Sequence, residues 1–472
     1  MREFAQRSYS RIKDSGYAMI VAVLVGCITE RDGDSAMRPE DSAAQADSSQ
    51  DTGSETLGEL VATVEYVGAH AYDLVGTKIA VGAFGLEDRA IAVGTPSAEA
   101  DDLSGVVTGV YVLAAPWSGG TVQSVASAGA PGPESSYNFG ISVALPGDMS
   151  GDGVADLAVG SDGTIADGTG GFYILDGAAP ADTIEGWEVA QVPSDEAFFV
   201  ATSLERCGSF AGGTVSLCVD TTQYESSFDY YAWVFDAPMA GDMSVSDAAV
   251  QIGGDVGVVE TEQGLRATDA DGDGREDLLA GSNTVRLVPG LDPGSYTWND
   301  VATATIEAKK LTDVGDLDGD GVVDFVIQRG DPDWNIAAVL RGPIAGELGA
   351  NDATWTFEGM PGFGSGAAIG DFDADGVADF AIGASRGPDG TTDPQGLVYV
   401  YAGPVTAAAW NASDATRTLR TSDVADGLGW NLLAAELDGE AGDDLLVGAP
   451  LGDGVAENAG SLHLLFGGDI LP

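Results

Sequence analysis

Short stretches in which apolar and polar residues alternate recur along the chain from about residue 58 onward. One kind is rich in aromatic and branched residues and follows a run that ends near a glycine, as LVYVYAGP follows FAIGA. An alternation with a period of two predicts strands rather than helices. Seven such aromatic stretches are present, and they begin at Gly109, Gly171, Tyr230, Thr284, Ile336, Leu397 and Ser461.

These strands belong to a repeating unit. Each unit contains an apolar strand, a strand that ends near a glycine, the aromatic strand and a more polar fourth strand. Acidic loops between the first two strands begin at residues 148, 269, 316, 371 and 436, and the first gap is long enough to hold one further unit. Repetition at this period predicts a β-propeller with one four-stranded blade per unit.

The count of strands predicts how the ring closes. Seven aromatic third strands are followed by only six fourth strands, and the chain stops just after the seventh. Glu59–Val67 has the pattern of the missing strand, and using it would remove an exposed sheet edge. We therefore predict an all-β fold over residues 58–472, a seven-bladed β-propeller in which Glu59–Val67 is the outermost strand of the last blade.

The acidic loops have the spacing of calcium ligands. In DFDADGVAD the acids stand at positions 1, 3, 5 and 9 and a glycine stands at position 6. Calcium takes about 6–8 oxygen ligands, which a tight loop supplies from alternate side chains and one backbone carbonyl. Position 7 would supply the backbone carbonyl oxygen. The predicted ligands of the four strong copies are then Asp148, Ser150, Asp152, Val154 and Asp156; Asp269, Asp271, Asp273, Arg275 and Asp277; Asp316, Asp318, Asp320, Val322 and Asp324; and Asp371, Asp373, Asp375, Val377 and Asp379.

A fifth copy is looser, because glutamates replace two of the aspartates. Its predicted ligands are Glu436, Asp438, Glu440, Gly442 and Asp444. We expect Ca²⁺ at the four strong copies, and the pattern leaves the fifth open. The alternative for every copy is an acidic turn that holds no metal.

An EF-hand is excluded by the residues on the C-terminal side of each loop. That motif needs a glutamate at position 12 and a helix on each side. Here position 12 is an apolar residue inside a short strand-like run, namely Val159, Ala280, Ile327, Ile382 or Val447. The loops are therefore expected to connect strands.

These units resemble the FG-GAP repeats of integrin α-chain propellers and their bacterial relatives. The resemblance is specific in the sixth and seventh units, where an FG-like pair, the acidic loop and a GAP-like turn follow one another. They are Phe363-Gly364, 371–379 and Gly383-Ala384 in the sixth, and Leu428-Gly429, 436–444 and Gly448-Ala449-Pro450 in the seventh. The resemblance covers about residues 58–472. It implies a seven-bladed propeller with calcium loops on the lower face and recognition of a partner on the upper face.

The first and third units depart from this pattern. The first has AFGLEDRA in place of the acidic loop, so we expect no metal there. The third has Cys207 and Cys218 around GSFAGGTVSL. In an exported protein these two cysteines are free to pair, and a disulfide would hold the turn that calcium holds elsewhere. The alternative is two reduced, buried thiols.

The N-terminus predicts export. Residues 1–26 combine a basic start with an apolar run from Tyr17 to Val25, which is too short to span a bilayer. Leu24–Cys27 resembles a bacterial lipobox, so Cys27 is the predicted lipidation site. The alternative is an ordinary signal peptide in which the cysteine occurs by chance. Residues 27–57 are rich in Ser, Asp and Ala and predict a disordered tether. We expect the mature protein to be lipid-anchored to the bacterial outer membrane or cell surface.

Charge narrows the range of partners. The formal net charge is −56, which argues against nucleic acid, whose binding relies on basic side chains. No catalytic constellation is convincing, because GASRG at 383–387 lacks the helix that a nucleophile elbow requires. We expect a monomeric, membrane-tethered adhesion or binding module that meets a protein or glycan on its upper face. The alternative is an anchored enzyme that acts on glycans or lipids.

Overall fold

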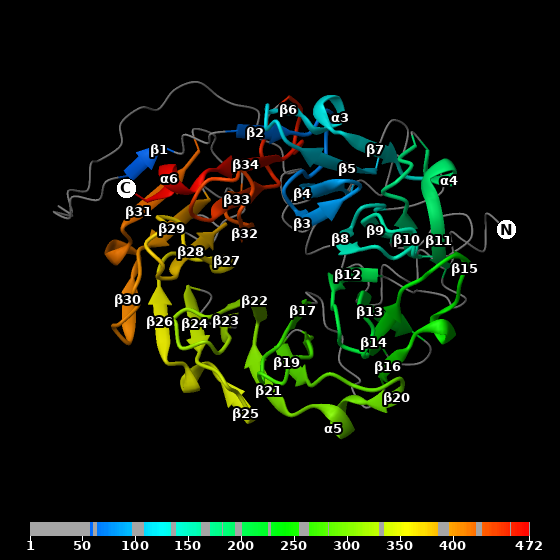
Figure 1. Cartoon of the computed structure of the whole chain (residues 1–472). Helices are drawn as coiled ribbons and strands as arrows, with labels where there is room; N and C mark the ends of the chain where they lie inside the picture. The colour runs from blue at the N-terminus through cyan, green and yellow to red at the C-terminus, as the bar shows by residue number, and fades with distance from the viewer. Residues whose placement is uncertain are drawn as a thin grey trace, which may run out of the picture.

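Seven β-sheets stand around a common centre in the computed structural model (Figure 1). The structure describes residues 57–59, 64–96, 108–133, 138–161, 170–181, 183–193, 201–224, 228–253, 264–281, 283–329, 335–385, 396–421, 427–453 and 455–471. The predicted seven-bladed β-propeller is confirmed. Strands one to four of each blade are antiparallel neighbours, and strand one lies nearest the centre in Figure 1.

The first three blades occupy residues 78–253. Blade one consists of β3 (Lys78–Phe84), β4 (Glu87–Thr95), β5 (Gly109–Ala114) and β7 (Ala128–Pro131). Blade two contains β8 (Ser142–Gly147), β9 (Asp156–Ser161), β10 (Gly171–Leu175) and β11 (Glu188–Pro193). Blade three contains β12 (Ala201–Arg206), β13 (Ser216–Tyr224), β14 (Phe228–Asp236) and β16 (Val250–Gly253).

The last four blades follow in chain order. Blade four contains β17 (Leu265–Thr268), β18 (Asp277–Ala280), β19 (Asn283–Val288) and β21 (Ala304–Ala308). Blade five contains β22 (Lys310–Gly315), β23 (Asp324–Gln328), β24 (Ile336–Leu340) and β26 (Trp355–Glu358). Blade six contains β27 (Phe363–Gly370), β28 (Asp379–Ala384), β29 (Leu397–Tyr401) and β31 (Arg417–Arg420). Blade seven contains β32 (Asn431–Ala435), β33 (Asp444–Ala449), β34 (Ser461–Leu465) and β2 (Val64–Val67).

Six blades carry a fifth strand that the sequence did not predict. In five of them it comes from the connection between strands three and four of the next blade around the ring, and it pairs in parallel with the fourth strand. These five added strands are β15 (Gly241–Asp242), β20 (Gly294–Thr297), β25 (Gly346–Gly349), β30 (Ala409–Asn411) and β6 (Gly120–Thr121). With the sixth added strand described below, six of the seven blades are thus hydrogen-bonded at the rim to the next blade; within the described residues blade one has four strands.

The N-terminal strand closes the ring, but over a shorter stretch than predicted. Val64–Val67 forms β2, which pairs antiparallel with β34 as the fourth strand of blade seven. Glu59 does not belong to this strand. It ends β1 (Leu57–Glu59), which pairs in parallel with β31 and supplies the fifth strand of blade six. The prediction that one strand runs from Glu59 to Val67 is therefore wrong at its start. In other units a short added strand in the connection precedes the fourth strand of the blade, and β1 and β2 follow the same order.

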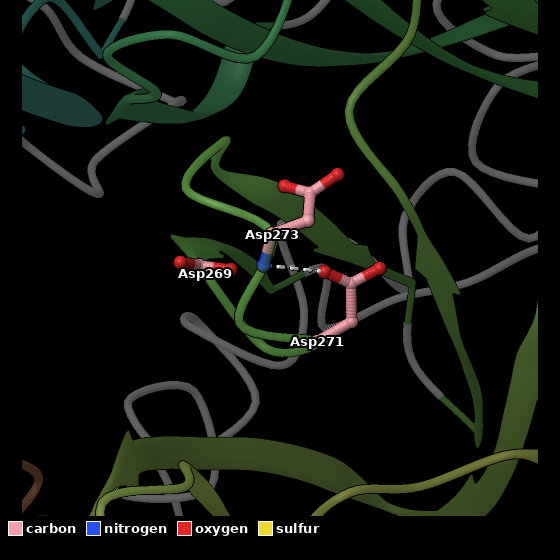
Figure 2. Close-up of side chains that lie close together, drawn as sticks. All are labelled: Asp269, Asp271 and Asp273. Carbon is pink, nitrogen blue, oxygen red and sulfur yellow. Dashed lines mark hydrogen bonds between the residues drawn. The ribbon is translucent and has the colours of Figure 1, made fainter.

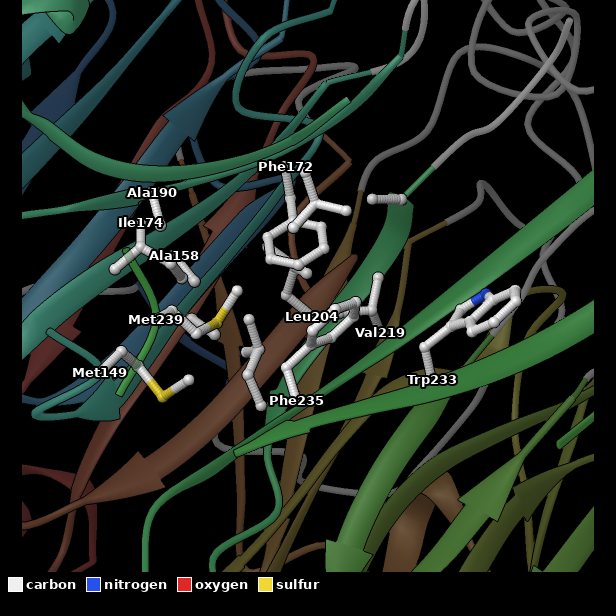
Figure 3. Close-up of a cluster of buried hydrophobic side chains, with 14 residues drawn as sticks. Met149, Ala158, Phe172, Ile174, Ala190, Leu204, Val219, Trp233, Phe235 and Met239 are labelled. Atoms are coloured by element: carbon white, nitrogen blue, oxygen red, sulfur yellow. The ribbon is translucent and has the colours of Figure 1, made fainter. Parts of the chain in front are cut away.

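The core lies between adjacent blades. Strands of a propeller are covered on both faces, so their residues form clusters that draw on two neighbouring sheets. Figure 3 shows the cluster between blades two and three, where Phe172 and Phe235 meet edge to face with ring centroids 5.2 Å apart. Met149 and Met239 extend this cluster to the ends of the sheets. Such burial contributes about 25 cal/mol per Å² of apolar surface.

The helices in the described residues are single turns. They are α3 (Val122–Val125), α4 (Ile184–Trp187), η1 (Val245–Asp247), α5 (Trp298–Val301), η2 (Ala350–Asp352), η3 (Ala412–Asp414) and α6 (Gly467–Ile470). The first six lie between strands three and four of their blades. None of the helices in the described part of the chain has the length and apolar character that a membrane span requires.

Candidate metal sites

Each of the five acidic loops connects strand one to strand two of its blade. Position 1 directly follows the last residue of strand one, and position 9 is the first residue of strand two, in all five copies. Strands therefore flank the loops on both sides. Because these turns leave equivalent ends of the sheets, all five loops lie on one face of the ring, which we call the loop face.

Glycine and the position 1 carboxylate shape the turn. In blade four, Asp269 accepts hydrogen bonds from the backbone N–H groups of Gly272 (2.8 Å) and Gly274 (3.0 Å). Both glycines have positive φ, at 79° and 88°, which lets the loop curl around the carboxylate. Asp271 accepts from the N–H of Asp273 at 3.0 Å (Figure 2). The loop thus orders its own acids.

Four loops bring three carboxylates together. Within each group one oxygen of every residue lies within 4.8 Å of the others. Oxygens on opposite sides of a calcium ion, each at about 2.3–2.6 Å, would be separated by about 4.6–5.2 Å, so the groups fit this ion and offer only oxygen donors. The groups are Asp269, Asp271 and Asp273; Asp316, Asp318 and Asp320; Asp371, Asp373 and Asp379; and Glu436, Asp438 and Asp444.

The remaining predicted ligands lie in the same loops but outside these groups. Two of these ligands stand at position 5, namely Asp375 in blade six and Glu440 in blade seven. At position 7, the backbone N–H groups of Val154, Arg275, Val322 and Val377 donate to the carboxylate at position 5. Gly442, the position 7 residue of the fifth loop, has a φ of 100°.

The loop of blade two brings fewer acids together. Its position 3 residue is Ser150, whose hydroxyl lies 3.4 Å from Asp148. Asp148 also accepts from the N–H groups of Gly151 and Gly153, at 2.7 and 2.8 Å. Asp148, Asp152 and Asp156 form no group of three carboxylates within the described residues. This strong copy of the sequence pattern therefore clusters fewer carboxylates than the other four.

The aspartate at position 9 ties three strands together. In blade six, Asp379 is buried and accepts from the N–H of Phe372 (2.8 Å) and from the N–H of Gly403 (2.8 Å), just beyond strand three. The same pair of contacts recurs in each of the other four loops, at Asp156, Asp277, Asp324 and Asp444. Position 9 is therefore structural as well as a potential ligand.

Burial raises the pKa values of the position 9 aspartates. It raises the pKa of Asp277 and of Asp324 to about 6, and the backbone N–H donors partly oppose this effect. The pKa values of Asp156, Asp379 and Asp444 are raised for the same reason. A divalent cation would favour the ionised forms that burial disfavours.

Arginines pair with acids of two loops, and a third loop contains an arginine of its own. Arg275, at position 7 in blade four, turns away from the acids and donates to the carbonyl oxygens of Phe210 and Leu291, each at 2.7 Å. Arg89 of blade one pairs with Glu436 across the junction with blade seven. Arg341 pairs with two acids of the loop in blade five.

Blade three has a disulfide where five other blades have acids. Cys207, directly after β12, is joined to Cys218 in β13, and both are fully buried. Blade one has a tight turn at the same place, and Leu86 at its tip is 92% exposed. Cys27, the predicted signal segment and the predicted tether up to residue 56 lie outside the described residues, whereas Leu57, the last predicted tether residue, begins β1.

A charged group in the middle of the ring was not predicted. Glu205, Arg266 and Asp313 lie on the innermost strands of blades three, four and five, and Arg266 is 3.8 Å from Glu205. Burial raises the pKa of Glu205 and of Asp313, and Arg266 opposes it. Local spacing gives no signal for such a group, because its members are far apart in the sequence.

The other candidate catalytic side chains are buried. His463 Nε2 lies 2.9 Å from Ser461 Oγ, but the two residues are only 5% and 6% exposed. Ser385 of the GASRG segment is also buried, and its N–H donates to Ser365 Oγ at 3.1 Å. A substrate has no access to either serine in this arrangement.

The fold and the acidic hairpins define a class, a seven-bladed β-propeller with oxygen-rich turns on one face. The FG-GAP repeat family model matches residues 363–401, which include the loop of blade six. This match and the seven blades confirm the predicted FG-GAP propeller, and they are consistent with the integrin α-chain type.

Part of the chain is also similar to phosphatidylinositol-glycan-specific phospholipase D. The identity is 35% over 109 residues with the human enzyme, 35% over 106 with that of Bos taurus and 37% over 98 with that of Rattus norvegicus. These alignments cover 21–23% of this chain and 11–13% of the enzymes. The chain thus spans only a small part of the relatives it matches.

Proposed function

We propose that this chain is an extracytoplasmic FG-GAP propeller whose hairpins are stabilised by Ca²⁺ and which serves as a membrane-tethered binding or adhesion module. One observation carries the calcium proposal. Four groups of carboxylates, each with oxygens within 4.8 Å of one another, occur at equivalent turns of one face. Repetition at equivalent places favours a shared ligand over chance clustering of acids.

Calcium would stabilise the ring rather than report a signal. Without a cation the three carboxylates of a group repel one another, and the ion converts this repulsion into attraction. Because the unfolded chain holds no such cage, binding adds to folding stability by mass action. Extracellular calcium modules typically bind at about 10⁻⁴–10⁻³ M, which is the range we expect here.

Thermal melting in calcium and in chelator tests this proposal. We expect calcium to raise the melting temperature and magnesium to raise it less, because magnesium demands tighter octahedral geometry. Titration calorimetry of the variant Asp371→Asn/Asp373→Asn should show one ion fewer than wild type. Asp414→Asn, in η3 outside the loops, is the matched control. A melting temperature that is the same with calcium and with chelator would refute a structural role.

The tether and the partner are proposed from the sequence and the topology. Lipidation of Cys27 would anchor the propeller, and mass spectrometry of the wild type and of Cys27→Ala tests this.

The connections opposite the loop face would meet a protein or glycan on the cell envelope. Affinity capture in calcium, with envelope protein and polysaccharide fractions as separate probes, should retain a component that is lost in chelator. Retention of nothing from either fraction would count against a binding module.

A second candidate is an enzyme that acts on glycans or lipids. Two observations favour it: the similarity to an enzyme named for phosphatidylinositol-glycan cleavage, and the pair Glu205 and Asp313, whose pKa values are raised beside Arg266. Incubation with a phosphatidylinositol-glycan-anchored protein tests it, with Glu205→Gln as the variant. Release of the anchored protein by the wild type and loss of release in the variant would favour the enzyme over the binding module.

A further inference from the structure

Arg341 holds two of the predicted calcium ligands in blade five. It directly follows β24, and its Nε and Nη2 atoms each lie 2.6 Å from one carboxylate, those of Asp318 and Asp320 respectively. The opposite oxygens of these carboxylates accept backbone N–H groups, from Asp320 at 3.2 Å and from Val322 at 2.9 Å. All four oxygens at positions 3 and 5 are therefore engaged without a metal.

Blade six shows the same loop without the arginine. Asp373 and Asp375 accept the equivalent backbone N–H groups, at 3.2 and 2.8 Å. The residue equivalent to Arg341 is Ala402, which likewise precedes the glycine that donates to position 9. Within the described residues, no side chain donates to the second oxygens of Asp373 and Asp375. Those oxygens stay open to an ion, and their counterparts in blade five do not.

We infer that Arg341 is a built-in counter-cation that holds the blade-five loop at low calcium and competes with calcium for Asp318 and Asp320. This inference rests on the proposed calcium role. The planar guanidinium bridges both carboxylates, as a lysine ammonium would not do with the same geometry. Calcium needs the same oxygens, and a positive charge about 3 Å from them opposes a second cation.

The arrangement is reversible in principle. The side chain of Arg341 is 47% exposed, so it can swing into solvent when an ion binds. The loops of blades five and six would then respond to calcium at different concentrations. Blade six would bind calcium at a lower concentration than blade five, and blade five would stay ordered in both conditions because one cation replaces the other.

Hydrogen exchange of the full chain over a calcium titration resolves individual loops. In wild type, we expect residues 316–324 to be protected without calcium and to require about tenfold more calcium than residues 371–379 for a further change. Arg341→Ala should lower the calcium midpoint of 316–324 by about tenfold, to that of 371–379, and remove its metal-free protection. In Arg341→Lys, the calcium midpoint of residues 316–324 should lie between the midpoints of wild type and Arg341→Ala.

Arg420→Ala is the matched control, because it removes one exposed positive charge far from the loops and should leave both midpoints unchanged. The Arg341→Ala chain should fold, since alanine occupies the equivalent place in blade six. If 371–379 responds to calcium but 316–324 keeps its wild-type midpoint in Arg341→Ala, the inference about Arg341 alone is overturned. If neither loop responds in any variant, the calcium proposal fails and this inference fails with it.

Discussion

His463 offers a prediction that is independent of calcium. It lies in β34 of blade seven, paired in register with Glu65 on one side and Val447 on the other. Its ring is buried and hydrogen-bonded to Ser461, and burial lowers the pKa of His463 to about 4. The imidazole should therefore stay neutral in the folded protein well below the pH at which the unfolded chain takes up a proton.

The difference in pKa between the two states sets the sign and size of the effect. The unfolded histidine has a pKa of about 6.5, so both states are neutral at pH 7. As the pH falls from about 6.5 to about 4, only the unfolded chain is protonated, and the folded state loses about 3 kcal/mol. In metal-free protein the buried aspartates act in the opposite direction, because Asp277 and Asp324 have pKa values raised to about 6 and protonation relieves their burial.

Proton NMR measures the pKa directly. The chain has two histidines, so His70→Gln leaves a single imidazole signal to follow. We expect it to titrate near pH 4, or not before acid unfolding. His463→Gln should reduce the loss of stability between pH 7 and pH 4.5 by about 2–3 kcal/mol relative to wild type. A His463 signal that titrates near pH 6.5 in the folded protein would refute the reasoning.

Three further predictions concern the blades and their closure. In chelator, Asp379→Ala should destabilise the protein by about 2–4 kcal/mol, because a buried and a partly buried N–H group lose their acceptor, whereas Asp373→Ala should cost less than about 1 kcal/mol. Equal losses in urea unfolding would contradict the structural role of position 9. Replacing both Cys207 and Cys218 by serine should cost about 3 kcal/mol, and thiol titration of the unfolded, unreduced wild type should find no free thiol from this pair. Tyr66→Ala should cost about 3–5 kcal/mol by opening the closing strand, and a smaller loss than about 1 kcal/mol would show that the ring does not depend on it.

The local features of this fold could be predicted from the sequence. Period-two alternation identified the strands, and the acidic spacing placed every loop between the correct pair of strands. Both signals involve residues within about ten positions of one another. The last blade was also predictable, because counting strands requires only their order.

Features that depend on distant residues could not be predicted. The fifth strands are two to four residues long and pair with the preceding blade, so no local alternation marks them. Glu59 was assigned to the closing strand because the residues up to Val67 alternate, although it pairs in register with Arg420 of blade six. Arg341 and Arg89 were missed because each reaches an acid through the fold rather than through sequence spacing.

The loops also connect metal binding to the packing of whole blades. The position 9 aspartate accepts an N–H from the turn after strand three, so an ion that fixes the loop fixes the exit of that strand as well. Blade three makes the equivalent link without an acid at the first position of strand two. Ser216, the first residue of β13, donates to Asp236 at the end of β14 at 2.6 Å, beside the disulfide. A covalent bond and a reversed hydrogen bond therefore join the same three strands, so calcium removal should loosen the acidic blades and spare this one.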